Sequence, residues 1–239
     1  MDIKCNSFID FLPCTYNNSL SENNLSTDLI IFDCDGVLVD SELISNTVMS
    51  EMLTSMGSPT SYEECITLFL GHSWNDCLKT IEQRAQKKMP DEFYDMYIKK
   101  VFFRFEKELQ PIKGIAKALD TISHRFCVAS SGPHEKINRT LTITGLVRKF
   151  DGKIYSAEDV KRGKPYPDLF LYAAKKMGSV ASKTIVVEDS IPGIKAGLAA
   201  GMKVLAYNPQ NSDQLNNLDT EGVFVFKSMQ QLPSLINSI

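Results

Sequence analysis

Residues 29–42 read LIIFDCDGVLVDSE, an apolar run that ends abruptly in acidic residues. An apolar run of this length without polar alternation predicts a parallel strand at 29–32 that is buried on both faces. Residues i and i+2 of an extended chain point the same way, so Asp33 and Asp35 should project into one space at the carboxyl end of the strand. Two carboxylates repel each other there. A hard cation such as Mg²⁺ between them offsets that cost, as does a proton that one acid keeps for a leaving group.

A turn without chemical function is the alternative for this loop. Gly36 would supply the unusual backbone angles, and Asp40 or Ser41 would cap the helix that follows. We accept this interpretation for Gly36, Asp40 and Ser41. A turn does not need two acids directly after a buried strand, so Asp33 and Asp35 become candidate functional residues.

The composition indicates a globular protein of ordinary surface charge. The chain has 239 residues, 43% of them hydrophobic and 23% charged, with a formal net charge of −3. This balance favours neither a nucleic-acid partner nor an anionic membrane. The six cysteines form no CxxC pair and have no His at ligand spacing, which argues against a zinc site or a disulfide framework. We see no membrane span or secretion signal, and a reducing cytoplasm fits the cysteine usage.

The rest of the chain divides into an extension, a helical block and an alternating block. Residues 1–28 are rich in Asn and Ser and predict a loosely held extension. Residues 43–110 show only helical patterns, near 43–56, 61–70, 74–88 and 91–108. Strands then alternate with helices: strands at 126–130, 153–155, 184–188, 203–207 and 223–226, and helices near 113–123, 134–144, 168–177 and 192–200.

These patterns predict an α/β fold with a doubly wound parallel sheet. The first strand pairs into the later half, so 29–42 and 111–239 form the core and 43–110 form an inserted all-helical cap.

Three further segments place polar groups at the same edge of the sheet. Ser130 and Ser131 follow a strand and precede a helix, where hydroxyls and backbone amides suit phosphate oxygens, although an ordinary Ser cap is the alternative. Lys164 lies in GKPYPD, whose prolines fix a loop ahead of a helix that Asp168 can cap. Glu188 and Asp189 end another apolar strand and would complete a Mg²⁺ site.

Two residues of the helical block are candidate substrate contacts. Arg104 or a neighbouring lysine could reach an anionic substrate, although a solvated helix face is the simpler interpretation. His72 lies in a loop between two helices that offers hydrogen-bonding groups with backbone freedom, although a surface His in a loop is usually just solvated. The aromatic residues of 91–108 follow helical spacing and indicate packing.

The chain resembles the haloacid dehalogenase (HAD) superfamily, whose first motif reads DxDGxLxDS. The match covers Asp33, Asp35, Gly36, Leu38, Asp40 and Ser41. Ser130, Lys164 and Glu188 with Asp189 follow in the order of the second, third and fourth motifs, so the resemblance runs over about 29–208. Residues 41–111 resemble the four-helix C1 cap of the β-phosphoglucomutase-like branch. Substrate-selecting loops of related enzymes lie in this part of the cap, so the resemblance implies His72 as a substrate contact by analogy.

The resemblance implies phosphoryl transfer to Asp33 as the nucleophile. Mg²⁺ would be held by Asp33, Asp189 and the backbone carbonyl of Asp35, with Glu188 steadying its water shell. Asp35 would protonate the leaving oxygen and later take a proton from water. Ser130, Ser131 and Lys164 would hold the phosphoryl oxygens. We expect a monomer or weak dimer that hydrolyses a small phosphorylated metabolite, a sugar phosphate or sugar-acid phosphate, with 6-phosphogluconate as the first to test.

Three other functions stay open. A dehalogenase lacks the acid that Asp35 supplies, and a non-catalytic regulatory or binding protein on this fold would lose one of Asp35, Lys164 or Asp189. A β-phosphoglucomutase-type mutase shares the core residues. In that pattern a His follows the first motif and an Arg follows the cap loop, whereas this chain has Ser45 and Trp74 there. The phosphatase is therefore preferred.

Overall fold

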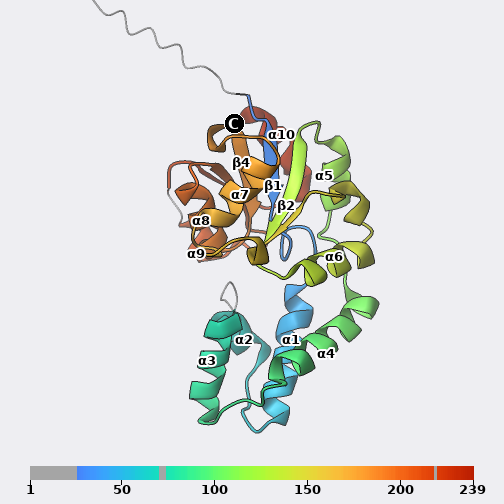
Figure 1. Ribbon diagram of the computed structural model, residues 1–239, viewed down its shortest axis with the longest axis vertical. Coiled ribbons are helices and arrows are strands. Elements are labelled where there is room, and N and C mark those ends of the chain that lie inside the picture. Colours follow the sequence, from blue (N-terminus) through green and yellow to red (C-terminus); the bar gives the residue numbers. More distant parts are fainter. Residues whose placement is uncertain (1–25, 70–73, 218–219) are drawn as a thin grey trace, which may run out of the picture.

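The computed structural model describes residues 26–69, 74–217 and 220–239 and contains a six-stranded parallel sheet in the order β3-β2-β1-β4-β5-β6. The strands are β1 (Leu29–Phe32), β2 (Arg125–Ser130), β3 (Ile154–Ser156), β4 (Thr184–Glu188), β5 (Lys203–Tyr207) and β6 (Val223–Phe226). The first strand pairs with β2 on one side and β4 on the other, and Figure 1 shows it inside the sheet. The predicted doubly wound α/β class is confirmed.

Helices cover both faces of the sheet because β1 is apolar on both. Ile30 and Phe32 face a core that includes residues of α5 (Ile115–Thr121), α6 (His134–Ile143) and α10 (Leu232–Ser238). Leu29 and Ile31 face a second core with α7 (Asp168–Lys176) and α8 (Ile191–Ala199). The short helix α9 (Asp213–Asn216) follows β5. Burial on both faces explains the absence of polar alternation in the strand sequence.

The described residues of the insert form four helices, which lie below the sheet in Figure 1: α1 (Glu42–Ser55), α2 (Tyr62–Phe69), α3 (Trp74–Ala85) and α4 (Phe93–Glu108). Their apolar sides meet in a core that includes Met52, Ile81 and Phe105. The chain enters and leaves this cap along adjacent segments, since Asp40 N–H donates to the carbonyl of Gln110 at 2.9 Å and Ile112 N–H to that of Leu38 at 3.0 Å. The cap is therefore joined to the core by two hydrogen-bonded segments.

Two predicted helix caps are wrong. Ser41 precedes α1 without a capping hydrogen bond, and its Oγ donates instead to Asp35 Oδ1 at 2.5 Å. An ionised carboxylate is the stronger partner for a hydroxyl group. Asp168 is the first residue of α7, and Arg162 binds its carboxylate through two hydrogen bonds of 3.0 and 2.9 Å. Gly36 has a φ of 76°, as the turn interpretation requires.

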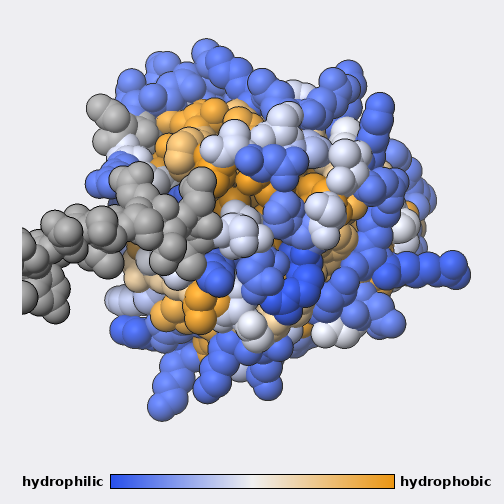
Figure 2. Space-filling view, turned by 90° about the horizontal axis from the view of Figure 1, so that it is seen from above, coloured by the Kyte–Doolittle hydropathy of each residue, from blue (hydrophilic) through white to orange (hydrophobic). Residues whose placement is uncertain are grey.

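The surface of the core opposite the cap is mainly hydrophilic, with apolar side chains between the charged ones (Figure 2). No helix among the described residues is long and apolar enough to span a membrane. Residues 1–25 of the predicted extension lie outside the described residues.

Candidate active site

The carboxyl ends of β1, β2 and β4 open into a cavity of about 510 Å³ between the sheet and the cap. Parallel strands bring their carboxyl ends to one edge, and the crossovers place the loops there as well. The lining includes all seven core residues predicted for the site, namely Asp33, Asp35, Ser130, Ser131, Lys164, Glu188 and Asp189. The structure thus brings these seven residues together from four distant segments.

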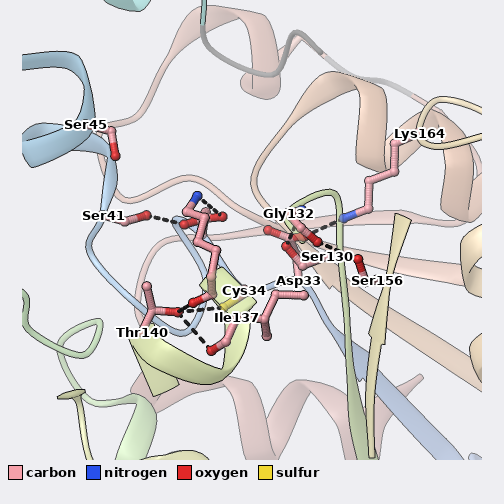
Figure 3. Close-up of polar contacts among 12 residues, drawn as sticks. Asp33, Cys34, Ser41, Ser45, Ser130, Gly132, Ile137, Thr140, Ser156 and Lys164 are labelled. Atoms are coloured by element: carbon pink, nitrogen blue, oxygen red, sulfur yellow. Dashed lines mark hydrogen bonds and ion pairs between the residues drawn. The ribbon is translucent and has the colours of Figure 1, made fainter. Parts of the chain in front are cut away.

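Lys164 joins the first and last acidic segments. Its Nζ donates to Asp33 Oδ1 at 2.5 Å and to Glu188 Oε1 at 2.7 Å, and Figure 3 shows the lysine pointing toward Asp33. The three side chains are almost fully buried, with exposures of 4% for Lys164, 10% for Asp33 and 1% for Glu188. Burial raises the pKa of Asp33 despite the opposing charge of Lys164. A second cation beside Asp33 would be stabilising for that reason.

Asp35 has two donors of its own. Ser41 Oγ donates to Oδ1, and Lys136 Nζ donates to Oδ2 at 2.8 Å. Burial opposes ionisation of Asp35, but Lys136 and Ser41 outweigh it and lower the pKa of the carboxyl. Asp33 and Asp35 therefore experience different electrostatic environments although they are two residues apart.

Ser130 lies at the end of β2 with its hydroxyl beside the loop that follows. The Ser130 Oγ accepts from Gly132 N–H at 3.2 Å, which leaves the hydroxyl proton available to a ligand. Ser156, at the end of β3, donates to the Gly132 carbonyl at 2.7 Å and holds this loop from the other side (Figure 3). Ser131 is exposed and lines the cavity.

The carboxylate of Glu188 is occupied by protein donors. Besides Lys164, it accepts from Asp189 N–H at 2.8 Å and from the N–H and Oγ of Ser190 at 2.7 and 2.9 Å. Glu188 thus shapes the loop that presents Asp189. Burial, followed by the charges of Glu188, Glu42 and Asp33, raises the pKa of Asp189 well above its ordinary value.

Two glycines leave the space that these acids fill. A Cβ atom at Gly36 would lie 1.9 Å from Asp189 Oδ2, and one at Gly193 would lie 1.7 Å from Glu188 Oε1. Both distances are far below van der Waals contact. The missing side chain at Gly36 lets the loop after β1 approach Asp189 closely, and the missing side chain at Gly193 lets Glu188 lie over the first turn of α8.

The oxygen atoms that line the cavity fit a divalent cation that prefers oxygen ligands. Five carboxylates but only two lysines, Lys136 and Lys164, are found among the described residues that line the cavity. No group of three or more His, Cys, Asp or Glu side chains in the described ranges could hold a metal by itself. An ion here would need a backbone carbonyl and water besides Asp33 and Asp189, which is how Mg²⁺ is usually bound.

The cap contributes an aromatic wall to the cavity, formed by Trp74, Tyr94 and Tyr97. The Trp74 ring stacks on Tyr97 at a centroid distance of 5.5 Å and meets Tyr94 edge-on at 4.7 Å. Ser45 and Asn46 of α1 also line the cavity. Ser45 and Trp74, the positions that distinguish this chain from the mutase pattern, thus lie where a substrate would bind.

Of the two candidate substrate contacts of the cap, Arg104 is engaged elsewhere in the structure and His72 stays untested. Arg104 is absent from the cavity lining and binds Glu108 at 2.9 Å and Glu51 at 3.2 Å, because both acids are its neighbours on the outer side of α1 and α4. His72 lies outside the described residues.

Sequence reasoning missed Lys136 and Glu42. Lys136 lies in the first turn of the helix after the Ser130 loop, a position that could have indicated it. Glu42 follows the first motif directly and lines the cavity. Burial and the charges of Asp35 and Asp40 raise its pKa to about 7.

Comparisons with known proteins agree with this geometry. The model of the haloacid dehalogenase-like hydrolase family matches residues 30–207. The 6-phosphogluconate phosphatase of Escherichia coli is 30% identical over 211 residues, which cover 87% of this chain and 94% of that protein.

Two crystal structures share the fold. A haloacid dehalogenase-like protein of Agrobacterium tumefaciens is 37% identical with a TM-score of 0.78, covering 89% of this chain and 99% of the other. A HAD family hydrolase of Deinococcus radiodurans, with bound phosphate and sodium, is 27% identical with a TM-score of 0.73 and covers 90% of this chain and 97% of the other. The chain therefore belongs to the haloacid dehalogenase-like hydrolase family.

Proposed function

We propose that the protein is a Mg²⁺-dependent phosphatase that hydrolyses a phosphorylated sugar or sugar acid through a phosphoryl group carried on Asp33. The observation that carries this proposal is the buried arrangement of Asp33, Lys164 and Glu188 at one end of a cavity that also contains Ser130 and Asp35. The similarity to 6-phosphogluconate phosphatase supports the substrate class.

Asp33 is the nucleophile in this scheme. Its Oδ1 is bound to Lys164, so the second oxygen is the one that attacks phosphorus. Lys164 and the hydroxyl of Ser130 neutralise and hold the phosphoryl oxygens, an electrostatic contribution that dominates phosphoryl transfer. Mg²⁺ held by Asp33, Asp189 and the carbonyl of Asp35 would offset the repulsion between the carboxylate and the phosphate.

Asp35 transfers the protons. It gives one to the leaving oxygen in the first step and takes one from the attacking water in the second. Its lowered pKa favours the ionised form that the second step requires, and the first step uses the minor protonated form. The two acids have different roles because Lys164 binds one and Lys136 binds the other.

The cap side of the cavity suits a hydroxylated carbon skeleton. Trp74, Tyr94 and Tyr97 offer apolar ring faces to C–H groups, while Ser45, Asn46 and Glu42 offer hydrogen-bonding groups to hydroxyls. This combination of apolar walls and few polar groups supports recognition of the leaving group by the cap.

A panel of phosphorylated metabolites that includes 6-phosphogluconate tests the proposal, with phosphate release scored as kcat/KM. Asp33→Asn should lower turnover on the order of 10³-fold or more while the protein stays folded. Excess EDTA should abolish turnover, and Mg²⁺ should restore it. Asp91→Asn, an exposed control, should retain full activity. Undiminished turnover of Asp33→Asn would refute the nucleophile, and undiminished turnover in EDTA would refute the metal.

A mass measurement makes the covalent step visible. The wild-type protein, acid-quenched during turnover, should carry one phosphoryl group on the peptide that contains Asp33. A phosphoryl group on another residue would contradict the assignment.

A further inference from the structure

We propose that Lys136 is a positioning residue that fixes the orientation of the Asp35 carboxylate for proton transfer. The inference rests on the proposed function, in which Asp35 exchanges protons with the leaving group and with water. None of the four motifs that identify the family contains Lys136, which lies in the first turn of α6.

The two oxygens of Asp35 are bound by donors from different parts of the chain. Ser41 Oγ, just before the cap, donates to Oδ1 at 2.5 Å, and Lys136 Nζ, from the core helix α6, donates to Oδ2 at 2.8 Å. The side chains of Lys136 and Asp35 are 22% and 27% exposed, so the pair lies at the wall of the cavity with one side open to a ligand.

Two donors are needed because the carboxylate would otherwise rotate. The terminal torsion of an Asp side chain is broad and has no sharp staggered minima. One hydrogen bond fixes one oxygen and leaves the other free to turn, whereas two bonds from opposite sides fix the plane of the group. Proton transfer requires a heavy-atom distance of about 2.6–3.2 Å, so this plane decides whether Asp35 can reach the leaving oxygen.

The backbone of α6 at Lys136 carries additional hydrogen bonds from a side chain that also contacts the acidic loop. Thr140, one turn further along α6, donates to the carbonyl of Lys136 at 3.0 Å and to that of Ile137 at 3.1 Å. The Thr140 Oγ1 also lies 3.8 Å from the Cys34 thiol, and either group can donate in this contact. Figure 3 shows this contact between α6 and the loop after β1. The helix and the acidic loop are thus packed as one unit.

The loop before α6 keeps Lys136 close to the phosphate-binding end. A Cβ atom at Gly132 would lie 3.5 Å from Lys136 Cδ, 3.6 Å from Ser130 Oγ and 3.9 Å from Asp35 Oδ2. One point of the backbone is therefore in contact distance of the phosphate-binding serine, the acid and the lysine. Lys136 acts beside the reacting groups while its charge is directed at Asp35.

The step that depends on this orientation can be written in full. An oxygen of Asp33 forms a bond to phosphorus as the bond from phosphorus to the leaving oxygen breaks. The leaving oxygen keeps the electron pair of that bond and takes the proton of Asp35, which becomes a carboxylate. A leaving group that forms a strongly acidic phenol can depart without this proton, whereas one that forms a weakly acidic phenol or alcohol needs it.

The experiment compares p-nitrophenyl phosphate with phenyl phosphate, because p-nitrophenol is much the stronger acid and the two substrates are similar in shape. Release of the phenol is followed in a single turnover with excess enzyme and Mg²⁺, which isolates the first step. Lys136→Met keeps the length of the side chain and removes the charge. Loss of the charge leaves more of Asp35 protonated, so a slower first step can only report the lost orientation of the carboxyl group. Lys136→Met should slow phenol release about tenfold or more and nitrophenol release by less than about threefold.

Three variants complete the test. Asp35→Asn should give the same contrast between the substrates, more strongly, and Lys136→Arg should restore much of the rate with phenyl phosphate. Lys117→Met, which removes an exposed helical lysine, should change neither rate. Thermal unfolding of each variant shows whether the fold is kept, and the enzyme concentration giving half the maximal rate should stay within about threefold of wild type.

The outcomes separate the two proposals. Equal losses with both substrates in Lys136→Met would mean that the lysine acts on the phosphoryl group or on folding, and no loss would mean that it is not needed; either result overturns the inference. If Asp35→Asn itself shows no contrast, the acid role in the proposed function is wrong. A wild-type protein that hydrolyses neither of these esters nor any phosphorylated sugar of the panel would refute the proposed phosphatase instead.

Discussion

Replacing Lys164 with Met tests how much the buried ion pair contributes to the fold. Lys164 is 4% exposed and donates to Asp33, which is 10% exposed, and to Glu188, which is 1% exposed. Methionine matches the length of the lysine but carries no charge. The substitution would leave two buried carboxylates without their common cation.

The expected loss of unfolding free energy is about 3–5 kcal/mol in EDTA, which is typical when one partner of a buried ion pair is removed. Lys79→Met is the matched control, since Lys79 pairs with Asp76 at 3.2 Å with exposures of 72% and 56%. An exposed pair of that kind should contribute less than about 1 kcal/mol.

The loss should also depend on pH. Burial already raises the pKa of Asp33 in the folded protein, and Lys164 is the main influence that opposes this. Without the lysine the folded-state pKa rises further above the unfolded value. The loss of unfolding free energy caused by ionised Asp33 is then fully present above the folded-state pKa. It decreases as the pH falls from there toward the pKa of Asp33 in the unfolded chain.

Urea unfolding followed by circular dichroism at pH 8 and pH 5, with EDTA, measures both effects. Lys164→Met should lose more stability at pH 8 than at pH 5, while Lys79→Met should lose little at either. A Lys164→Met protein as stable as the control variant, or one whose loss is the same at both pH values, would refute the reasoning.

Two further predictions concern the cavity. Glu42→Gln should stabilise the metal-free protein at pH 8 by on the order of 1–3 kcal/mol and change its stability little at pH 4.5, because a folded-state pKa of about 7 makes the ionised form costly only at the higher pH. Urea unfolding at both pH values checks this, and an equal gain in stability at pH 4.5 would contradict it. With β-glucose 1-phosphate and a trace of the 1,6-bisphosphate, free phosphate should exceed glucose 6-phosphate, because Ser45 and Trp74 carry no charge for a second phosphate; faster formation of glucose 6-phosphate would instead indicate a mutase.

The sequence was sufficient for the architecture because the sheet has a strong local signal. The run at 29–32 is the observed β1, and the other predicted strands agree with the structure within one residue at each end. Gly145, Gly178 and Gly201 follow α6, α7 and α8, and their φ values of 75°, 67° and 73° are those of left-handed helix ends. The helix α10 has no counterpart in the predictions: it is only seven residues long, and Pro233 stands in its first turn, where proline is compatible with a helix.

The site was predictable where a residue directly follows a buried strand, and less so elsewhere. Asp33, Ser130 and Glu188 stand at strand ends, so the topology alone brings them to one edge. Lys136 stands on a helix, where lysines are common, and only its contact with Asp35 separates it from a solvated residue. Arg104 had the right charge, but which face of α4 turns toward the cavity depends on packing within the cap.

The close approach of Gly36 and Gly193 to the acids has a consequence for laboratory evolution of this protein. In a library covering every position, both glycines should reject even alanine, because a methyl group would displace Asp189 or Glu188. Gly57, Gly145, Gly152 and Gly178 have no atoms within 4 Å of such a methyl group, so substitution there meets only the unfavourable backbone angle. A screen for activity should therefore find only glycine at positions 36 and 193, although neither residue has a side chain that could take part in the reaction. A search for new substrates can leave both out and spend its diversity on the aromatic wall of the cap.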